Sequence, residues 1–191
     1  MPNLSKKKVI PIHAGWSFSL DSKSLLRLHK HGLLRLFKME AYNKSKPFHS
    51  TTFFSSLVES NLYQELFFDH FSQFVKGKHG PFLIKNIKAG NFSKESNRFF
   101  EQDFLQLVSS PKWGCPAISI SALEKVKILL AHIVKESTLI YSLDKCRPFN
   151  ASSNEAKIYE HEWSHNLTSF YEYILYNPNL KVAYVLILTY E

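Results

Sequence analysis

Two histidines one helical turn apart, with a glutamate beside the first, are the residues of this chain whose spacing best fits a chemical site. The segment reads His161-Glu162-Trp163-Ser164-His165. On a helix, residues i and i+4 share a face, so His161 and His165 could bind one Zn²⁺ while Glu162 activates a water molecule. Glu172 falls on the same side of a helical wheel and is the predicted third ligand. The spacing therefore predicts a zinc-dependent hydrolase as one function.

These five residues resemble the HExxH motif of the zincin metallopeptidases, and the resemblance covers no more of the chain. It implies Zn²⁺ as cofactor and hydrolysis as the reaction. Three ligands on one helix depart from the zincin pattern, in which the third ligand follows a turn or lies on another helix. The trio also lies opposite the apolar stripe of the predicted helix, so the polar surface of an ordinary amphipathic helix is the alternative.

A second pattern begins at Asp144, which ends the apolar run 139–143 and is followed by Glu155-Ala156-Lys157. It resembles the PD-(D/E)xK nucleases, in which two carboxylates hold Mg²⁺ at a phosphate and a lysine steadies the attacking water. The resemblance implies catalytic roles for Asp144, Glu155 and Lys157. That nuclease site needs residues 155–163 in a strand, whereas the HExxH site needs them in a helix. Both alternatives stay open.

Positive charge is concentrated at the start of the chain. The first fifty residues carry ten Lys/Arg against Asp21 and Glu40, and the remaining 14 basic and 14 acidic residues cancel. Such a region attracts a phosphate backbone, a membrane surface or an acidic partner. A second basic stretch lies at residues 76–98. The predicted nucleic-acid-binding residues are Lys6, Lys7, Lys8, Lys23, Arg27, Lys30, Arg35, Lys38, Lys76, Lys78, Lys85 and Lys88.

These observations predict a basic protein or subunit that binds nucleic acid, with a metal-dependent nuclease as its catalytic extension. DNA and RNA remain equal alternatives, and whether the chain is an enzyme stays open. A non-catalytic interaction subunit of a larger protein complex is the third class. The cofactor would be Mg²⁺ for the nuclease and Zn²⁺ for the hydrolase.

Length and composition limit the fold and the compartment. With 191 residues, of which 45% are hydrophobic, the chain can bury one core. We expect a basic tail at residues 1–8 and a single globular domain at residues 9–191. The sequence has no run of eighteen apolar residues, so no transmembrane segment is predicted. The start lacks the apolar stretch of a signal peptide. Cys115 and Cys146 are expected to be reduced thiols, which predicts an intracellular protein of the cytoplasm or nucleus.

Hydrophobic periodicity predicts an α+β or α/β fold with four to five helices and a small sheet of four to five strands. Residues 23–39 form an amphipathic helix with one cationic side, unless Gly32 divides them into a helix and a strand at residues 33–42. The other predicted helices lie at about 51–75, 95–108, 121–135 and 155–176. The predicted strands lie at 82–87, 117–120, 138–143 and 181–190.

Overall fold

A six-stranded antiparallel sheet with the strand order β1-β2-β8-β7-β6-β5 organises the chain, which has an α+β fold. The computed structural model describes residues 15–43, 47–66, 77–109, 117–144, 160 and 169–190. The strands of the sheet are β1 (Trp16–His29), β2 (Gly32–Asn43), β5 (Phe92–Lys94), β6 (Leu139–Leu143), β7 (Ser169–Asn177) and β8 (Val182–Tyr190). The other elements are α1 (Ser50–Glu59), α2 (Asn61–Leu66), β3 (Lys78–His79), β4 (Phe82–Leu83), the 3-10 helices η1 (Ile84–Asn86) and η2 (Ala89–Asn91), α3 (Asn97–Ser109) and α4 (Ile120–Glu136).

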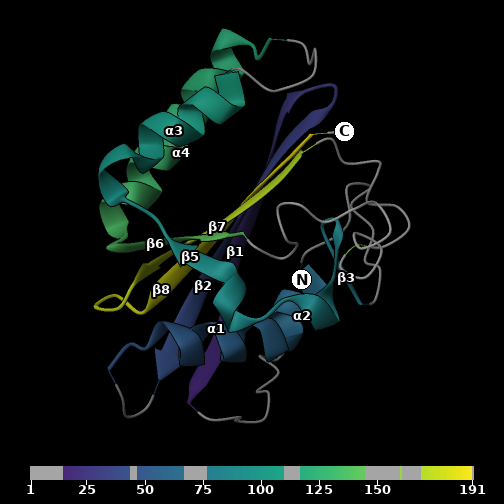
Figure 1. Ribbon diagram of the computed structural model, residues 1–191. Helices are drawn as coiled ribbons and strands as arrows, with labels where there is room; N and C mark the ends of the chain where they lie inside the picture. The colour runs from purple at the N-terminus through teal and green to yellow at the C-terminus, as the bar shows by residue number, and fades with distance from the viewer. Residues whose placement is uncertain are drawn as a thin grey trace, which may run out of the picture.

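Helices lie on both faces of this sheet (Figure 1), α1 and α2 on one and α3 and α4 on the other. Side chains of a strand alternate between the faces, and both faces of β8 are buried. Val185 and Ile187 pack in the cluster under α1, whereas Leu186 and Leu188 pack in the cluster under α4. The strand predicted at residues 181–190 is confirmed as β8. A strand that is covered on both faces is apolar throughout, and this made it recognisable in the sequence.

The expected helices at 95–108 and 121–135 are confirmed as α3 and α4, and the expected strand at 138–143 as β6. The strand predicted at 117–120 is wrong. Residues 117–119 have no regular structure, and Ser119 caps α4 by accepting a hydrogen bond from the N–H of Ala122 at 3.2 Å. The strand predicted at 82–87 ends after Leu83, where η1 begins.

The helix predicted at residues 23–39 is wrong, because β1 and β2 form a hairpin there. The alternative strand at 33–42 is confirmed as β2. Leu26 and Leu28 of β1 and Leu34 and Leu36 of β2 contact the cluster under α3 and α4. A helical wheel also places Leu26, Leu28 and Leu36 on one side, although Leu34 falls outside that stripe, so the apolar pattern fits a helix nearly as well as it fits the hairpin.

The helix predicted at 51–75 is interrupted at Ser60, whose backbone is extended. The Oγ of Ser60 donates to the carbonyl oxygen of Leu57 at 2.6 Å and accepts the N–H of Tyr63 at 3.1 Å. One side chain thus ends α1 and caps α2. In the part of the chain that the structure describes, no helix is long and apolar enough to cross a membrane.

The helix predicted to reach Tyr176 is wrong from residue 169 onward, where β7 begins. Ile174 and Tyr176 of β7 pack under α1, while Tyr173 and Leu175 contact the opposite cluster. This strand is rich in aromatic residues and has partners on both edges and both faces, which favours an extended backbone.

Candidate nucleic-acid interface and the buried Glu172 cluster

A β-bulge in β1 decides which face of the sheet carries its positive charges. The register with β2 shifts between Leu20 and Ser22. Just after this shift, Lys23 lies opposite Phe37, a core residue under α1. Cross-strand partners share a face, so Lys23 lies on the face that α1 and α2 cover. Arg27 follows four residues later on the same strand and shares that face.

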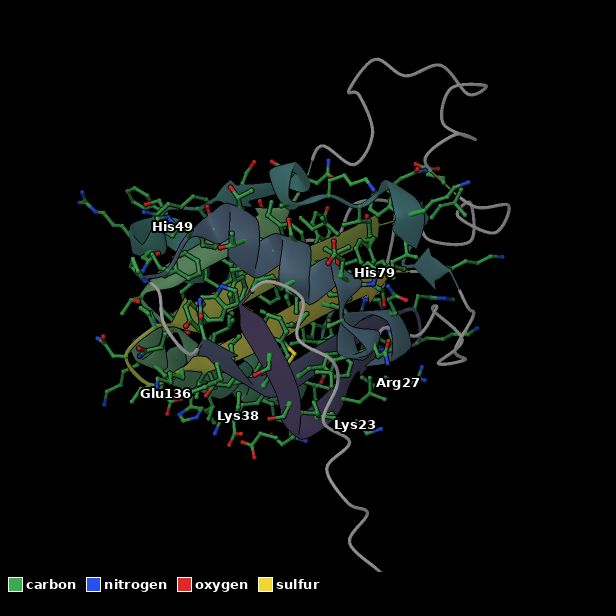
Figure 2. All side chains as sticks on the ribbon, turned by 90° about the horizontal axis from the view of Figure 1, so that it is seen from below. Lys23, Arg27, Lys38, His49, His79 and Glu136 are labelled. Carbon is green, nitrogen blue, oxygen red and sulfur yellow. The ribbon has the colours of Figure 1, made fainter. Side chains whose placement is uncertain are left out.

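Lys23, Arg27 and Lys30 are all exposed, and we call these three residues the cationic edge. They belong to β1 and to the turn that follows it. The guanidinium of Arg27 donates through Nη1 to the carbonyl oxygen of Lys30 at 3.2 Å, which ties the turn to the strand. Lys23 and Arg27 lie near one another at the rim of the molecule, whereas Lys38 lies apart from them (Figure 2).

The acidic residues of the hairpin lie away from the cationic edge. Asp21, the bulge residue, pairs with the ammonium of Lys38 at 3.2 Å. Lys38 lies opposite Tyr184, which packs on the α3 and α4 side, so Lys38 is on the other face of the sheet. Glu40 accepts a hydrogen bond from the hydroxyl of Ser19 at 3.0 Å. Both carboxylates of the hairpin therefore have partners other than Lys23 and Arg27.

Arg35, the remaining predicted cation of this region, is 5% exposed. It lies on β2, an interior strand, between Leu25 of β1 and Ile187 of β8. Its guanidinium is therefore not part of the cationic edge, although it lies on the same face of the sheet.

The second basic stretch lies on other elements. Lys78 is half-buried on β3, while Lys85 on η1 and Lys88 before η2 are exposed. The N–H of Lys88 donates to the side-chain oxygen of Asn91 at 2.6 Å, which fixes the start of η2. Four further predicted cations lie outside the described residues: Lys6, Lys7, Lys8 and Lys76.

Asp144, the first residue of the predicted nuclease motif, directly follows β6. Its Oδ1 accepts a hydrogen bond from the hydroxyl of Ser93 at 2.8 Å, and its N–H donates to the carbonyl oxygen of Asn91 at 2.8 Å. These contacts fasten the end of β6 to β5. Glu155 and Lys157 lie outside the described residues. Within the described residues, no group of three or more His, Cys, Asp or Glu side chains could hold a metal ion.

Glu172 lies on β7 rather than on a helix that continues from the HExxH segment. His161, Glu162 and His165 themselves lie outside the described residues. Their neighbour Glu160 forms an isolated antiparallel bridge with Phe82, so the backbone at residue 160 pairs as a strand does. The predicted arrangement of all three ligands on one helix is therefore wrong.

The carboxylate of Glu172 is instead the centre of a buried polar cluster. The hydroxyl of Tyr63 on α2 donates to its Oε1 at 3.0 Å, and the Nε2 of His79 on β3 makes a short contact with its Oε2. The rings of Tyr63 and His79 stack with their centroids 4.3 Å apart and their planes at 22°. Side chains of the pair His79 and Glu172 are fully buried. We call Tyr63, His79 and Glu172 the Glu172 cluster.

The cluster joins β7 to two elements, α2 and β3, that come much earlier in the sequence. Nothing in the local pattern around Tyr63 or His79 indicated a shared partner. The sequence signal that could have located it is Glu172 itself, a single charge within the aromatic and aliphatic run at residues 170–176. Once that run is a strand with both faces covered, its carboxylate must be buried, and a buried carboxylate needs hydrogen-bond donors.

A glycine beside His79 lets β3 and β4 approach the sheet closely. Gly80 has a φ of +54°, and a Cβ built on it would lie 2.3 Å from Cε2 of Phe170. Phe170 is the residue of β7 that precedes Glu172 on the same face, and its ring meets the ring of His79 edge-on at 5.8 Å. The turn at Gly80 therefore sets the distance between β3 and the Glu172 cluster.

Comparison with known proteins finds similarity to solved structures at low scores. No family model and no curated protein matches the chain. Two crystal structures of citrus MAF1, in different space groups, are similar at TM-scores of 0.35 and 0.34 with 18% and 17% sequence identity. The matches cover 84% and 86% of this chain and 89% and 92% of the citrus chains. At these scores neither a shared fold nor a shared function follows.

Proposed function

We propose that this protein binds nucleic acid through the cationic edge. The observation that carries the proposal is the bulge between Leu20 and Ser22, which leaves Lys23 and Arg27 exposed on one face while Asp21 pairs elsewhere. Because Asp21 pairs with Lys38, its charge is directed away from Lys23 and Arg27. Lys30 adds a third charge at the end of the same strand.

Contact between these side chains and phosphates would release condensed counterions, and this is the main source of sequence-independent affinity. Lys23 and Arg27 are four residues apart on one strand, which separates their Cα atoms by about 13 Å. An extended backbone of either DNA or RNA offers phosphates over such a distance. The proposed contacts involve phosphates only, so the expected binding has little sequence preference.

A different role would also place cations here. β1 is an edge strand of the described sheet, and charged side chains and bulges on edge strands prevent pairing with other chains. At the opposite edge, β5 has three residues and is protected by its shortness. Edge protection requires only that the charges be exposed, whereas nucleic-acid binding requires affinity that falls steeply with salt. The two roles are therefore separable by experiment.

The test is fluorescence anisotropy of a labelled single strand and a duplex, each of about 20 nucleotides, between about 50 and 200 mM salt. We expect Lys23→Gln with Arg27→Gln to lower the slope of log affinity against log salt by about 1.4 for the single strand and about 1.8 for the duplex. The matched control is Lys125→Gln with Lys135→Gln, which removes two exposed cations from α4 on the other side of the sheet.

Equal slopes for the two double variants would show that only net charge matters and would contradict the proposed site. A wild-type protein with no affinity for either oligonucleotide at low salt would exclude nucleic-acid binding altogether. The cationic edge would then be assigned to edge protection or to an acidic partner in a larger complex, as in the interaction-subunit prediction. Flotation with anionic vesicles would identify a membrane surface as that partner.

The enzyme hypotheses stay predictions. The Mg²⁺ nuclease depends on Asp144, Glu155 and Lys157, and the Zn²⁺ hydrolase on Glu162 between its two histidines. Among these catalytic residues, the structure describes Asp144. Cleavage of the labelled oligonucleotides by wild type and by Asp144→Ala in Mg²⁺ checks the first hypothesis, and the zinc content of the purified protein checks the second.

A further inference from the structure

The Glu172 cluster brings together segments that are separated by 109 residues between Tyr63 and Glu172 and by 93 residues between His79 and Glu172. Both hydrogen bonds converge on one carboxylate, one at each oxygen. The carboxylate projects from β7, which has a partner strand on each side in the centre of the sheet. Glu172 is therefore held firmly, while its two partners come from short peripheral elements.

Those peripheral elements have little stability of their own. Helix α2 has six residues, and isolated helices of that length do not form in water. Strands β3 and β4 have two residues each and pair with one another in a separate sheet, and so small a hairpin is not stable alone. Both elements must therefore obtain their order from contacts with the rest of the molecule.

Glu172 is a contact that α2 and β3 share. Tyr63 connects the two elements directly as well, because its ring stacks on the ring of His79. If α2 moves away from the sheet, the carboxylate loses a donor while still buried, and His79 loses its stacking partner. If β3 moves away, the same carboxylate loses its other donor. Loss of either partner raises the cost of keeping the other in place.

We infer that Glu172 is a positioning residue that couples the docking of α2 to the docking of the β3 and β4 hairpin, so that both leave the sheet together as one local unit. The unit opens without unfolding of the central strands β2, β8 and β7. This coupling depends on the hydrogen bonds of the Glu172 cluster and is independent of the proposed binding of nucleic acid. Local units of this kind are the usual low-stability parts of a domain.

Hydrogen exchange of the full chain, followed by mass spectrometry, tests the coupling. The diagnostic variant is Tyr63→Phe, which removes the hydroxyl and keeps the ring on His79. A hydrogen bond to a charged group affects an opening equilibrium by about tenfold or more. We expect exchange to rise about tenfold in peptides covering residues 61–66 and by a similar factor in peptides covering residues 78–83, although the hydroxyl that is removed donates to Glu172 on β7.

The control is Tyr190→Phe, which removes a hydroxyl that donates to the carbonyl oxygen of Leu107 at 3.1 Å on α3. Its effect should appear in α3 and leave residues 61–66 and 78–83 unchanged. Glu172→Gln keeps an acceptor and a donor at the same place and should exchange more slowly in these segments than Glu172→Ala. This partial rescue distinguishes the hydrogen bonds from simple loss of packing.

Three results would overturn the inference. One is a rise confined to residues 61–66 in Tyr63→Phe, which would mean that the two elements open separately. Another is an equal rise in the peptides of β2 and β8, which would mean global destabilisation. The third is a failure of Glu172→Gln to exchange more slowly than Glu172→Ala. None of these outcomes depends on affinity for nucleic acid, so the proposed function succeeds or fails by its own test.

Discussion

Substitution of Gly80 by alanine tests whether the turn after β3 sets the position of the Glu172 cluster. Gly80 has a φ of +54°, and the added methyl group would lie 2.3 to 2.7 Å from three carbon atoms of the Phe170 ring. Gly77 provides a matched control, since its φ is +80° and a Cβ there would meet no heavy atom of the described residues within 4 Å, apart from its chain neighbours. Both variants impose a left-handed backbone on alanine, but only Gly80→Ala also creates an overlap.

The expected cost follows from these two contributions. A left-handed backbone costs an L-residue about 1 to 2 kcal/mol, and loss of glycine's freedom in the unfolded chain recovers about 0.4 to 1 kcal/mol. Gly77→Ala should therefore be destabilised by about 1 kcal/mol. Overpacking adds about 1 to 3 kcal/mol at Gly80. For a chain of this size, each kcal/mol lowers the melting temperature by about 2 to 4 °C, so Gly80→Ala should melt about 2 to 12 °C below Gly77→Ala.

Thermal unfolding followed by circular dichroism measures this difference, and a double-mutant cycle identifies its cause. In a Phe170→Leu background the ring is gone, so the cost of Gly80→Ala should fall to that of Gly77→Ala. Equal melting temperatures for Gly80→Ala and Gly77→Ala in the wild-type background would refute the reasoning. So would a Gly80→Ala cost that is unchanged in the Phe170→Leu background, because the overlap with that ring would then not be its source.

Three further predictions concern the core and two ionisable groups. Phe54 is 1% exposed and stacks on Phe92 with centroids 4.1 Å apart, so Phe54→Ala should lower the free energy of unfolding by about 3 to 5 kcal/mol in urea titrations. Burial, and secondly the charge of His31, lower the pKa of His29, whose Nδ1 accepts the N–H of His31 at 3.2 Å. The stability that neutral His29 contributes is therefore present above pH 6.5 and is lost on acidification. Urea midpoints should fall less between pH 7.5 and 5 (about the range of histidine titration) in His29→Gln than in wild type. Burial raises the pKa of Tyr176 to about 12 from 10.0. The stability that this shift contributes is present below pH 10.0 and is lost towards pH 12. Burial raises the pKa of Tyr173 and Tyr184 as well, so absorbance at about 295 nm should show one fewer late-ionising tyrosine in Tyr176→Phe than in wild type.

The sequence predicts correctly the elements whose pattern of apolar and polar residues matches the way they are buried in the fold. Helices α3 and α4 have one apolar face and polar residues on the other, and their period of 3.6 residues is visible locally. Strand β8 is apolar throughout because helices cover both of its faces. In each of these segments the fold buries most of the apolar residues, at least in part.

The elements that the sequence predicts wrongly are those whose burial depends on distant segments. In β7, Glu172 interrupts the apolar pattern, so a helix with a polar face fits the sequence as well as a strand does. The strand is preferred because Tyr63 and His79 supply donors to that carboxylate from other parts of the chain. Arg35 was predicted on an exposed surface for a related reason, since a local pattern does not show that β2 is an interior strand.

The bulge in β1 is the feature on which the proposed interface depends. Asp21 is the additional residue between Leu20, which lies opposite Met39, and Ser22, which lies opposite Lys38. Met39 and Lys38 are consecutive in β2. Deletion of Asp21 would therefore make Leu20 and Ser22 consecutive in β1 while each keeps its partner in β2. The deletion should preserve the faces of β1 and cost only an exposed ion pair, about 0 to 1 kcal/mol.

Deletion of Ser24 is the contrasting change, because Ser24 lies in the regular part of β1, opposite Leu36. Removing it shifts one half of the strand by a residue, and either Lys23 or the buried Leu28 must change faces. We expect this variant to lose several times more stability than the Asp21 deletion in parallel melting experiments. It should also lose the salt-dependent binding attributed to the cationic edge, which the Asp21 deletion should retain. Equal losses of stability would mean that Asp21 is not the additional residue, and the assignment of Lys23 and Arg27 to the face of α1 would then be wrong.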